Sequence, residues 1–104
     1  MKVNFGKVLV DFDGAAISAK DKNEAVLRGV AVDALLAIYQ DEQNLSGEEK
    51  LKRYILAEKV YKKEDDLTVE EIALLKKLIG KAYAPLIVGQ AWKILEGKDD
   101  GFKE

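Results

Sequence analysis

The chain has 104 residues, of which 48% are hydrophobic and 35% are charged, and its formal net charge is -2. This length predicts one small domain with a single core and no room for a large internal active site. The nearly balanced charge gives no overall attraction to nucleic acid or anionic lipid. Cysteine and histidine are absent, which excludes disulfides, thiolate metal sites, Cys nucleophiles, Ser-His-Asp catalysis and histidine-based zinc hydrolysis. We therefore expect no enzyme, no cofactor and no metal site.

The N-terminal stretch MKVNFGKVLVDF alternates apolar residues with charged and polar ones. It therefore lacks the continuous apolar region of a signal peptide. The most apolar stretch, Ala25 to Gln40, contains Arg28 and Asp33 and is too short to span a bilayer. These features predict a cytoplasmic protein.

The residues Val8 to Ala19 predict a β-hairpin, because Asp13-Gly14 is a strong signal for a type I′ turn and lies between two short apolar runs. With these two residues as the loop, the side chains on the inner face would be those of Val8, Val10, Phe12, Ala15, Ile17 and Ala19. Leu9 would point the other way. An isolated hairpin is marginal in water, so we expect it to pack against helices.

The stretch KVLVDFDGAAI resembles the first motif of the haloacid dehalogenase superfamily, in which four apolar residues lead into Asp-x-Asp-Gly. The resemblance implies that Asp11 is a nucleophile and Asp13 a general acid/base. It does not continue along the chain, because the family requires a doubly wound parallel sheet and the rest of this sequence has helical patterns. The hairpin is the preferred interpretation of these residues.

The stretch Ala25 to Gln40 predicts a central helix around which the other elements pack. Asp21 or Asn23 is expected as its N-cap. At about 100° per residue, one broad face of this helix contains Leu27, Ala31, Ala34, Leu35, Ile38 and Tyr39. A helix this apolar has to be covered on most sides.

Three further helices are predicted in the second half of the chain. Ser46 with Glu49, and Thr68 with Glu71, form capping boxes that start two of them, the first running to about Lys62. The last helix is predicted over Pro85–Glu96, since proline suits a first helical turn, and it ends at a glycine. Residues 1–97 are expected to form one domain, and residues 98–104 a flexible tail.

Some apolar residues do not fit the inner faces of these helices. Leu51 and Ile55 lie nearly opposite the wide apolar face of their helix, and Leu86 lies off the face of the last helix. Apolar side chains outside a core can mark an interface, so these three residues are predicted to bind a protein partner or a second copy of the chain.

A second functional hypothesis rests on lysines of the last two helices. Lys76, Lys77, Lys81 and Lys93 could form a basic patch, and two helices joined by a tight turn suggest a small nucleic-acid-binding or transcription-associated protein. The net negative charge and the scarcity of side chains suited to reading base edges make this the weaker alternative.

The whole chain resembles small uncharacterised proteins encoded by tailed phages and prophages. The resemblance rests on VDFDGAAI, VAVDALLA and EEIALLKKLIGKAYAPLIVGQAWKILE, which are packing patterns and carry no functional residue. It implies a phage-encoded accessory or host-interaction protein that acts in the host cytoplasm by binding another protein. The sequence as a whole thus predicts a non-catalytic protein-binding module with an α+β fold, a β-hairpin packed on about four helices.

Overall fold

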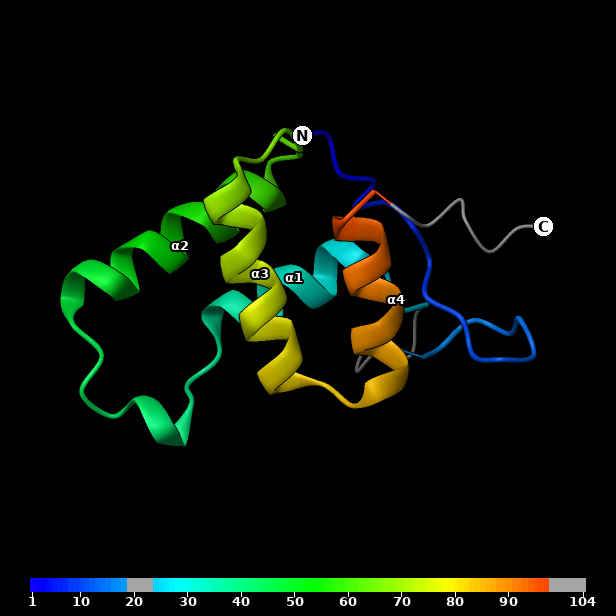
Figure 1. Cartoon of the computed structure of the whole chain (residues 1–104), viewed down its shortest axis with the longest axis horizontal. Helices are drawn as coiled ribbons and strands as arrows, with labels where there is room; N and C mark the ends of the chain where they lie inside the picture. The colour runs from blue at the N-terminus through cyan, green and yellow to red at the C-terminus, as the bar shows by residue number, and fades with distance from the viewer. Residues whose placement is uncertain (19–23, 98–104) are drawn as a thin grey trace.

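The computed structural model describes residues 1–18 and 24–97, and this part of the chain forms four α-helices and one 3-10 helix (Figure 1). The elements are α1 (Leu27–Leu36), η1 (Gln40–Glu42), α2 (Gly47–Tyr61), α3 (Val69–Ala82) and α4 (Pro85–Leu95). Helix α1 packs against α2 and α3, and α3 packs against α4. In Figure 1, α2 and α4 lie on opposite sides of α3.

The predicted α+β fold class is wrong: the described residues form a bundle of four helices, with isolated β-bridges but no strand and no sheet. The chain does reverse here, but not by the predicted type I′ turn, which needs a positive φ at both Asp13 and Gly14, because Asp13 has no positive φ. The N–H of Gly14 donates to the carbonyl of Asp11 over 3.0 Å, and Gly14 has a φ of +87°, which glycine adopts at little steric cost. The turn therefore spans Asp11 to Gly14, one residue earlier than predicted, and the two arms meet at an isolated antiparallel bridge between Val10 and Ala16 without forming strands.

The predicted pairing of Val10 with Ile17 does not form, because the arms are shifted by one residue and Gln90 binds the backbone of Val10. Gln90, on α4, accepts a hydrogen bond from the N–H of Val10 and donates one to the carbonyl of Val10. These are the groups that the predicted hairpin would pair with Ile17. The N–H of Ile17 instead donates to the carbonyl of Leu9 over 3.0 Å, and the N–H of Leu9 donates to Ala25 over 2.8 Å.

Before the turn, the inner face of the N-terminal segment is the opposite of the predicted one. Phe12 is 98% exposed, whereas Phe5 and Leu9 are completely buried. A shift of one residue in an extended segment moves its side chains to the other face, which explains this exchange. After the turn, Ile17 packs against the core as predicted, and Ala19 lies outside the described residues. Val3, Phe5 and Leu9 have the same phase along the chain, and all three belong to the core.

Helix α1 is shorter than the predicted Ala25 to Gln40. It begins after Val26, which provides no side-chain cap, and it ends at Leu36 because Ala37 is extended. Asp21 and Asn23, the predicted caps, lie outside the described residues. Four members of the predicted inner face are buried, namely Leu27, Ala31, Ala34 and Leu35. Ile38 is not part of the helix and is 97% exposed.

The predicted starts of the other helices are confirmed. The hydroxyl of Ser46 accepts a hydrogen bond from the N–H of Glu49 at the start of α2. At the start of α3, Thr68 and Glu71 make both hydrogen bonds of a capping box. Helix α4 starts with proline as predicted and ends before Gly97, which has a φ of +75°. The predicted tail, residues 98–104, lies outside the described residues.

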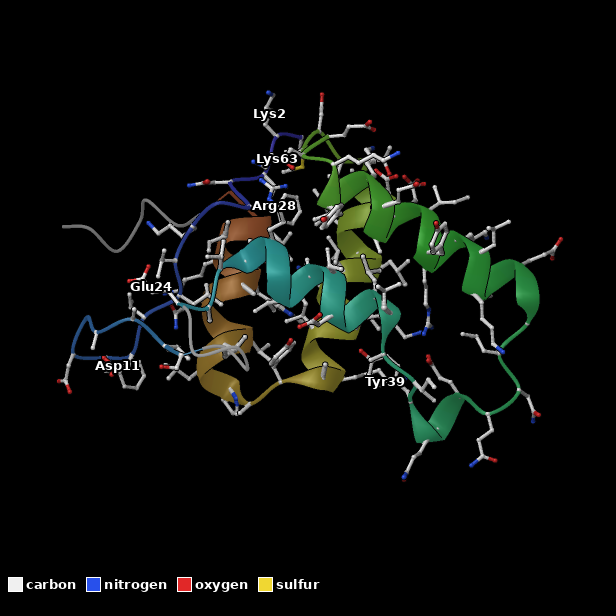
Figure 2. All side chains as sticks on the ribbon, turned by 180° about the vertical axis from the view of Figure 1, so that it is seen from behind. Lys2, Asp11, Glu24, Arg28, Tyr39 and Lys63 are labelled. Carbon is white, nitrogen blue, oxygen red and sulfur yellow. The ribbon has the colours of Figure 1, made fainter. Side chains whose placement is uncertain are left out.

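One core cluster joins all four helices and the N-terminal segment. Its largest fully buried side chains include Phe5, Leu9, Leu27, Leu35, Leu67, Leu75, Leu78, Ile79 and Leu95. The N-terminal segment covers the start of α1, where the N–H of Arg28 donates to the carbonyl of Phe5 over 2.9 Å. Figure 2 shows Lys2, Arg28 and Lys63 at this end of the molecule and Tyr39 at the other end of α1.

Candidate functional site

A groove of about 540 Å³ lies between the end of α1, the connection that contains η1, and the first half of α2. Its apolar lining consists of Leu35, Leu36, Ala37, Ile38, Tyr39, Leu45 and Tyr54. Lys50, Arg53 and Glu42 are among its polar lining residues. In Figure 1 the connection leaves α1, passes η1 and returns to the start of α2 at the left of the molecule.

Large apolar side chains are exposed around this groove. Leu36 and Tyr54 are each more than half exposed, and Ile38 is almost fully exposed. Leu51 and Ile55, which neighbour Tyr54 on the outer face of α2, are also more than half exposed. We refer to these five residues, Leu36, Ile38, Leu51, Tyr54 and Ile55, as the apolar surface.

The geometry of α2 explains why Leu51 and Ile55, two of these five residues, point outward. The buried residues of this helix, which are Arg53, Leu56, Ala57 and Val60, face α1 and the core. At about 100° per residue, Leu51 and Ile55 lie on the opposite side of the helix. The sequence predicted this placement of Leu51 and Ile55.

An ion pair beneath the groove attaches the connection to α2. Arg53, which is only 5% exposed, donates from its two terminal nitrogens to the two carboxylate oxygens of Glu42, over 2.7 and 2.9 Å. Bidentate pairs of this kind fix orientation as well as distance. The ammonium nitrogen of Lys81, on α3, lies 3.0 Å from a carboxylate oxygen of Glu42 and 3.0 Å from a carboxylate oxygen of Asp41. The 3-10 helix η1 is therefore attached to two helices.

The electrostatics of this cluster favour its charged forms. The hydrogen bonds from Arg53, and next those from Lys81, lower the pKa of Glu42 from 4.5 to about 2. The hydrogen bond to Glu42 raises the pKa of Arg53 in turn. The ammonium of Lys81 also lies 4.9 Å from the centre of the Tyr39 ring, at a distance typical of a cation–π contact.

Tyr39 lines the groove and contacts α3. Its hydroxyl group lies 2.7 Å from the carbonyl of Ala34 and 3.3 Å from that of Leu78. Burial is the main cause that raises the pKa of this hydroxyl. The contacts of Tyr39 turn the chain back toward α3 directly after α1, and Ile38, the residue before it, is left on the surface.

Sequence reasoning missed the pair of Arg53 and Glu42. One signal was present: Arg53 occurs three, four and seven residues before Leu56, Ala57 and Val60, so it falls on the core face of its helix. A charged residue on a core face needs a partner. No local spacing rule, however, identifies a glutamate eleven residues earlier as that partner.

The structure brings two of the three predicted partner-binding residues together and separates the third. Leu51 and Ile55 lie side by side on α2 as part of the apolar surface. Leu86 is half-buried at the start of α4, and Figure 1 shows α4 and α2 on opposite sides of α3. Leu86 is therefore not part of the apolar surface.

The lysines of the nucleic-acid hypothesis are partly occupied by acidic partners. Lys76 forms an ion pair with Glu96 and lies 4.7 Å from the centre of the Trp92 ring. Lys81 binds the acidic residues of η1 as described above. Two of the four lysines thus have their charge balanced by a neighbouring carboxylate, which weakens the electrostatic attraction of this face for phosphates.

The aspartates that resemble a dehalogenase motif have a structural role in the turn. One carboxylate oxygen of Asp11 accepts hydrogen bonds from the N–H groups of Asp13 and Ala15, over 2.9 and 3.0 Å. The parallel sheet that this family requires does not occur in residues 1–18 and 24–97. Nor does this part of the chain contain a group of three or more acidic side chains placed to bind a metal ion.

No protein-family model matches the chain, and comparisons with curated proteins and with solved structures also find no match. The resemblances to phage proteins and to the dehalogenases therefore stay predictions. In addition, none of the helices in the described residues is long and apolar enough to cross a membrane.

Proposed function

We propose that the protein is a non-catalytic protein-binding module and that the apolar surface is its binding site. One observation carries the proposal: five large apolar side chains are each more than half exposed, and three of them, Leu36, Ile38 and Tyr54, line a groove of about 540 Å³. Apolar side chains gathered in this way around a depression are typical of protein interaction sites, whereas single exposed ones are common everywhere.

The attachment of the connection supports binding with a small loss of entropy. Glu42 is bonded to Arg53 on α2 and to Lys81 on α3, so the connection that follows Ile38 is attached to two helices. A loop that is ordered before binding loses little freedom when a partner arrives. Lys50 provides a polar rim beside the apolar residues.

The resemblance to phage-encoded proteins suggests a context for this activity. In that context the module would be an accessory or host-interaction protein in the bacterial cytoplasm, and its partner would be a host or phage protein. The nucleic-acid alternative has less support, because Lys76 and Lys81 have acidic partners.

Site-specific photo-crosslinking in a bacterial lysate tests the proposal. The photoreactive residue p-benzoylphenylalanine is placed at position 38 in one variant and at position 77 in a matched control, since Lys77 is exposed on α3 away from the groove. We expect discrete protein adducts from position 38 that are absent from position 77. These adducts should disappear when Tyr54→Asp is added.

Two results would contradict the proposal. The first is the absence of adducts at position 38. The second is an identical set of adducts at both positions, because it would indicate random collisions. Adducts that persist at position 38 in the Tyr54→Asp variant would show that the apolar surface is not the binding site.

A further inference from the structure

The outer side of α2 is a helix face that no other described element covers. Helix α2 forms the upper left edge of the molecule in Figure 1, and no described element lies beyond it. Leu51, Tyr54 and Ile55 are exposed along this edge, and Tyr61 near the end of the helix is 72% exposed. Four exposed apolar side chains therefore lie along this helix, among charged residues such as Glu58 and Lys62.

The charges on α2 are complementary to those of a second α2 that runs antiparallel to it. Glu48 lies seven residues before Ile55 and Lys62 lies seven residues after it. Seven residues correspond to about two helical turns, so the three side chains lie along the same side of α2. Lys62 already forms an exposed ion pair with Glu58 on its own helix, over 3.3 Å. An antiparallel copy of the helix centred on Ile55 would bring each Glu48 opposite a Lys62, as a second acidic partner of that lysine.

We propose that a second copy of this chain binds antiparallel along α2, with a two-fold axis at Ile55, so that Ile55 meets the partner's Ile55 and Glu48 meets the partner's Lys62. Such a contact is isologous and closed, because the same surface is used by both copies. The inference rests on the proposed function, since it names the partner of the same apolar surface.

The groove lies beside the proposed contact, on the side of α2 that carries Tyr54. Tyr61 lies six residues after Ile55, on the same flank of α2 as Tyr54. In the antiparallel arrangement, the partner's Tyr61 therefore comes next to the start of α2, where Lys50 and Tyr54 border the groove. The exposed tyrosine ring of each copy then covers apolar side chains of the other.

The size of the contact sets the expected strength. Helix α2 has 15 residues and is about 22 Å long. One helix face of this length buries less than the roughly 800 Å² per partner that is typical of stable interfaces. We therefore expect a dimer with a micromolar dissociation constant, which requires measurements from about 5 to about 500 µM.

Sedimentation equilibrium across this range provides the first test. The wild type should shift from the 11.6 kDa monomer toward twice that mass. The Ile55→Asp variant should remain a monomer, because it places two carboxylates at the axis. Val69→Asp is the matched control, since Val69 is exposed at the start of α3, where an acidic residue suits the helix, and this variant should dimerise like the wild type.

Reversal of the two charges tests the antiparallel direction. Glu48→Lys alone and Lys62→Glu alone should each weaken the dimer about tenfold, because each creates two like-charge contacts. The double variant Glu48→Lys, Lys62→Glu should restore the wild-type dissociation constant. Failure of the double variant to recover would overturn the antiparallel arrangement.

A single introduced cysteine tests the position of the axis. The chain has no cysteine, so Ile55→Cys gives one unambiguous thiol per copy. At a two-fold axis this thiol meets its own counterpart, and mild oxidation should yield a disulfide-linked dimer. The control Val69→Cys should stay monomeric under the same treatment; equal linking of both variants would contradict the proposed axis.

The failure of this inference can be distinguished from that of the proposed function. A wild type that stays monomeric at every concentration, while position 38 still crosslinks to another protein, removes the self-association and keeps the binding module. A monomer that also gives no specific adducts removes both.

Discussion

The two ends of helix α1 use the same ion-pair chemistry but differ in what covers them. At the start, Arg28 forms a bidentate pair with Asp65 over 2.8 and 3.0 Å, and the N-terminal segment places Phe5 in the core. At the end, Arg53 and Glu42 form an equivalent pair, but Ile38 above them is exposed. An ion pair therefore fixes a loop in place, whereas only a further segment of chain buries the apolar residues that the loop carries.

The two pairs also differ in burial. The side chains of Arg28 and Asp65 are each about one-fifth exposed, whereas Arg53 is 6% exposed and Glu42 is 13% exposed. Removing charges from water costs free energy that only close partners recover. The pair below the groove is therefore the more sensitive of the two to the loss of a partner.

The largest expected effect is at the covered end. Replacing Phe5, which is completely buried, by alanine should lower the free energy of unfolding by about 4 kcal/mol, because it leaves a cavity in the core. Phe12→Ala is the matched control and should change stability by less than about 0.5 kcal/mol, because Phe12 is exposed. Urea unfolding measures both. A larger loss for Phe12→Ala than for Phe5→Ala would mean that the N-terminal segment has the other face inward.

The next effect compares the two arginines. Arg53→Ala should cost about 3 kcal/mol, because it removes a buried stem and one partner of a buried pair. Arg28→Ala should cost roughly 1.5 kcal/mol, because its pair is partly solvated. Urea unfolding again measures the difference. A larger loss for Arg28 than for Arg53 would contradict the ranking by burial.

A third prediction concerns acid. The folded pKa of Glu42 is about 2, below its ordinary value of 4.5, so its contribution to stability is complete above about pH 4.5 and declines as the pH falls toward 2. Thermal unfolding temperatures measured from about pH 6 to about pH 2 should show this decline in the wild type. Glu42→Gln should remove that part of the decline.

The control for the acid experiment is at the other end of α1. The hydrogen bond from Arg28 also lowers the pKa of Asp65, so Asp65→Asn should remove a different part of the acid dependence and leave that of Glu42 in place. Titration of the carboxyl carbons by NMR assigns each part. A Glu42 carboxyl that titrates near 4.5 would contradict the bonded pair.

The smallest expected effect is at the uncovered end. Ile38→Ser should change the free energy of unfolding by less than about 0.5 kcal/mol, because Ile38 is 97% exposed. Thermal unfolding of the isolated protein measures this. A loss well above 1 kcal/mol would mean that Ile38 packs against the core and is not available to a partner.

Local rules predicted the helical part of the fold well. Ser46 and Thr68 start their helices because a side-chain oxygen accepts a backbone N–H three residues later, which depends on nothing distant. Pro85 starts the last helix for an equally local reason. Local rules could not predict the loss of the hairpin, because Gln90 binds Val10 from a position 80 residues further along the chain.

The candidate site was partly predictable for the same reason. Helical periodicity alone placed Leu51 and Ile55 on the outer side of α2. The exposure of Ile38 could not be foreseen, since the pattern continues α1 past the residue where it ends. The chain turns there because the hydroxyl of Tyr39 lies within hydrogen-bonding distance of the carbonyl of Leu78 on α3, and periodicity carries no information about that contact.

The sequence by itself determined where α2, α3 and α4 begin and that Leu51 and Ile55 lie outside the core face of α2, because capping and periodicity act over one or two helical turns. The tertiary structure decided which of two alternating faces of the N-terminal segment is buried, how early α1 ends, and that Arg53 finds Glu42. These outcomes depend on contacts between residues far apart in the chain, where several pairings satisfy the same local pattern and packing selects one.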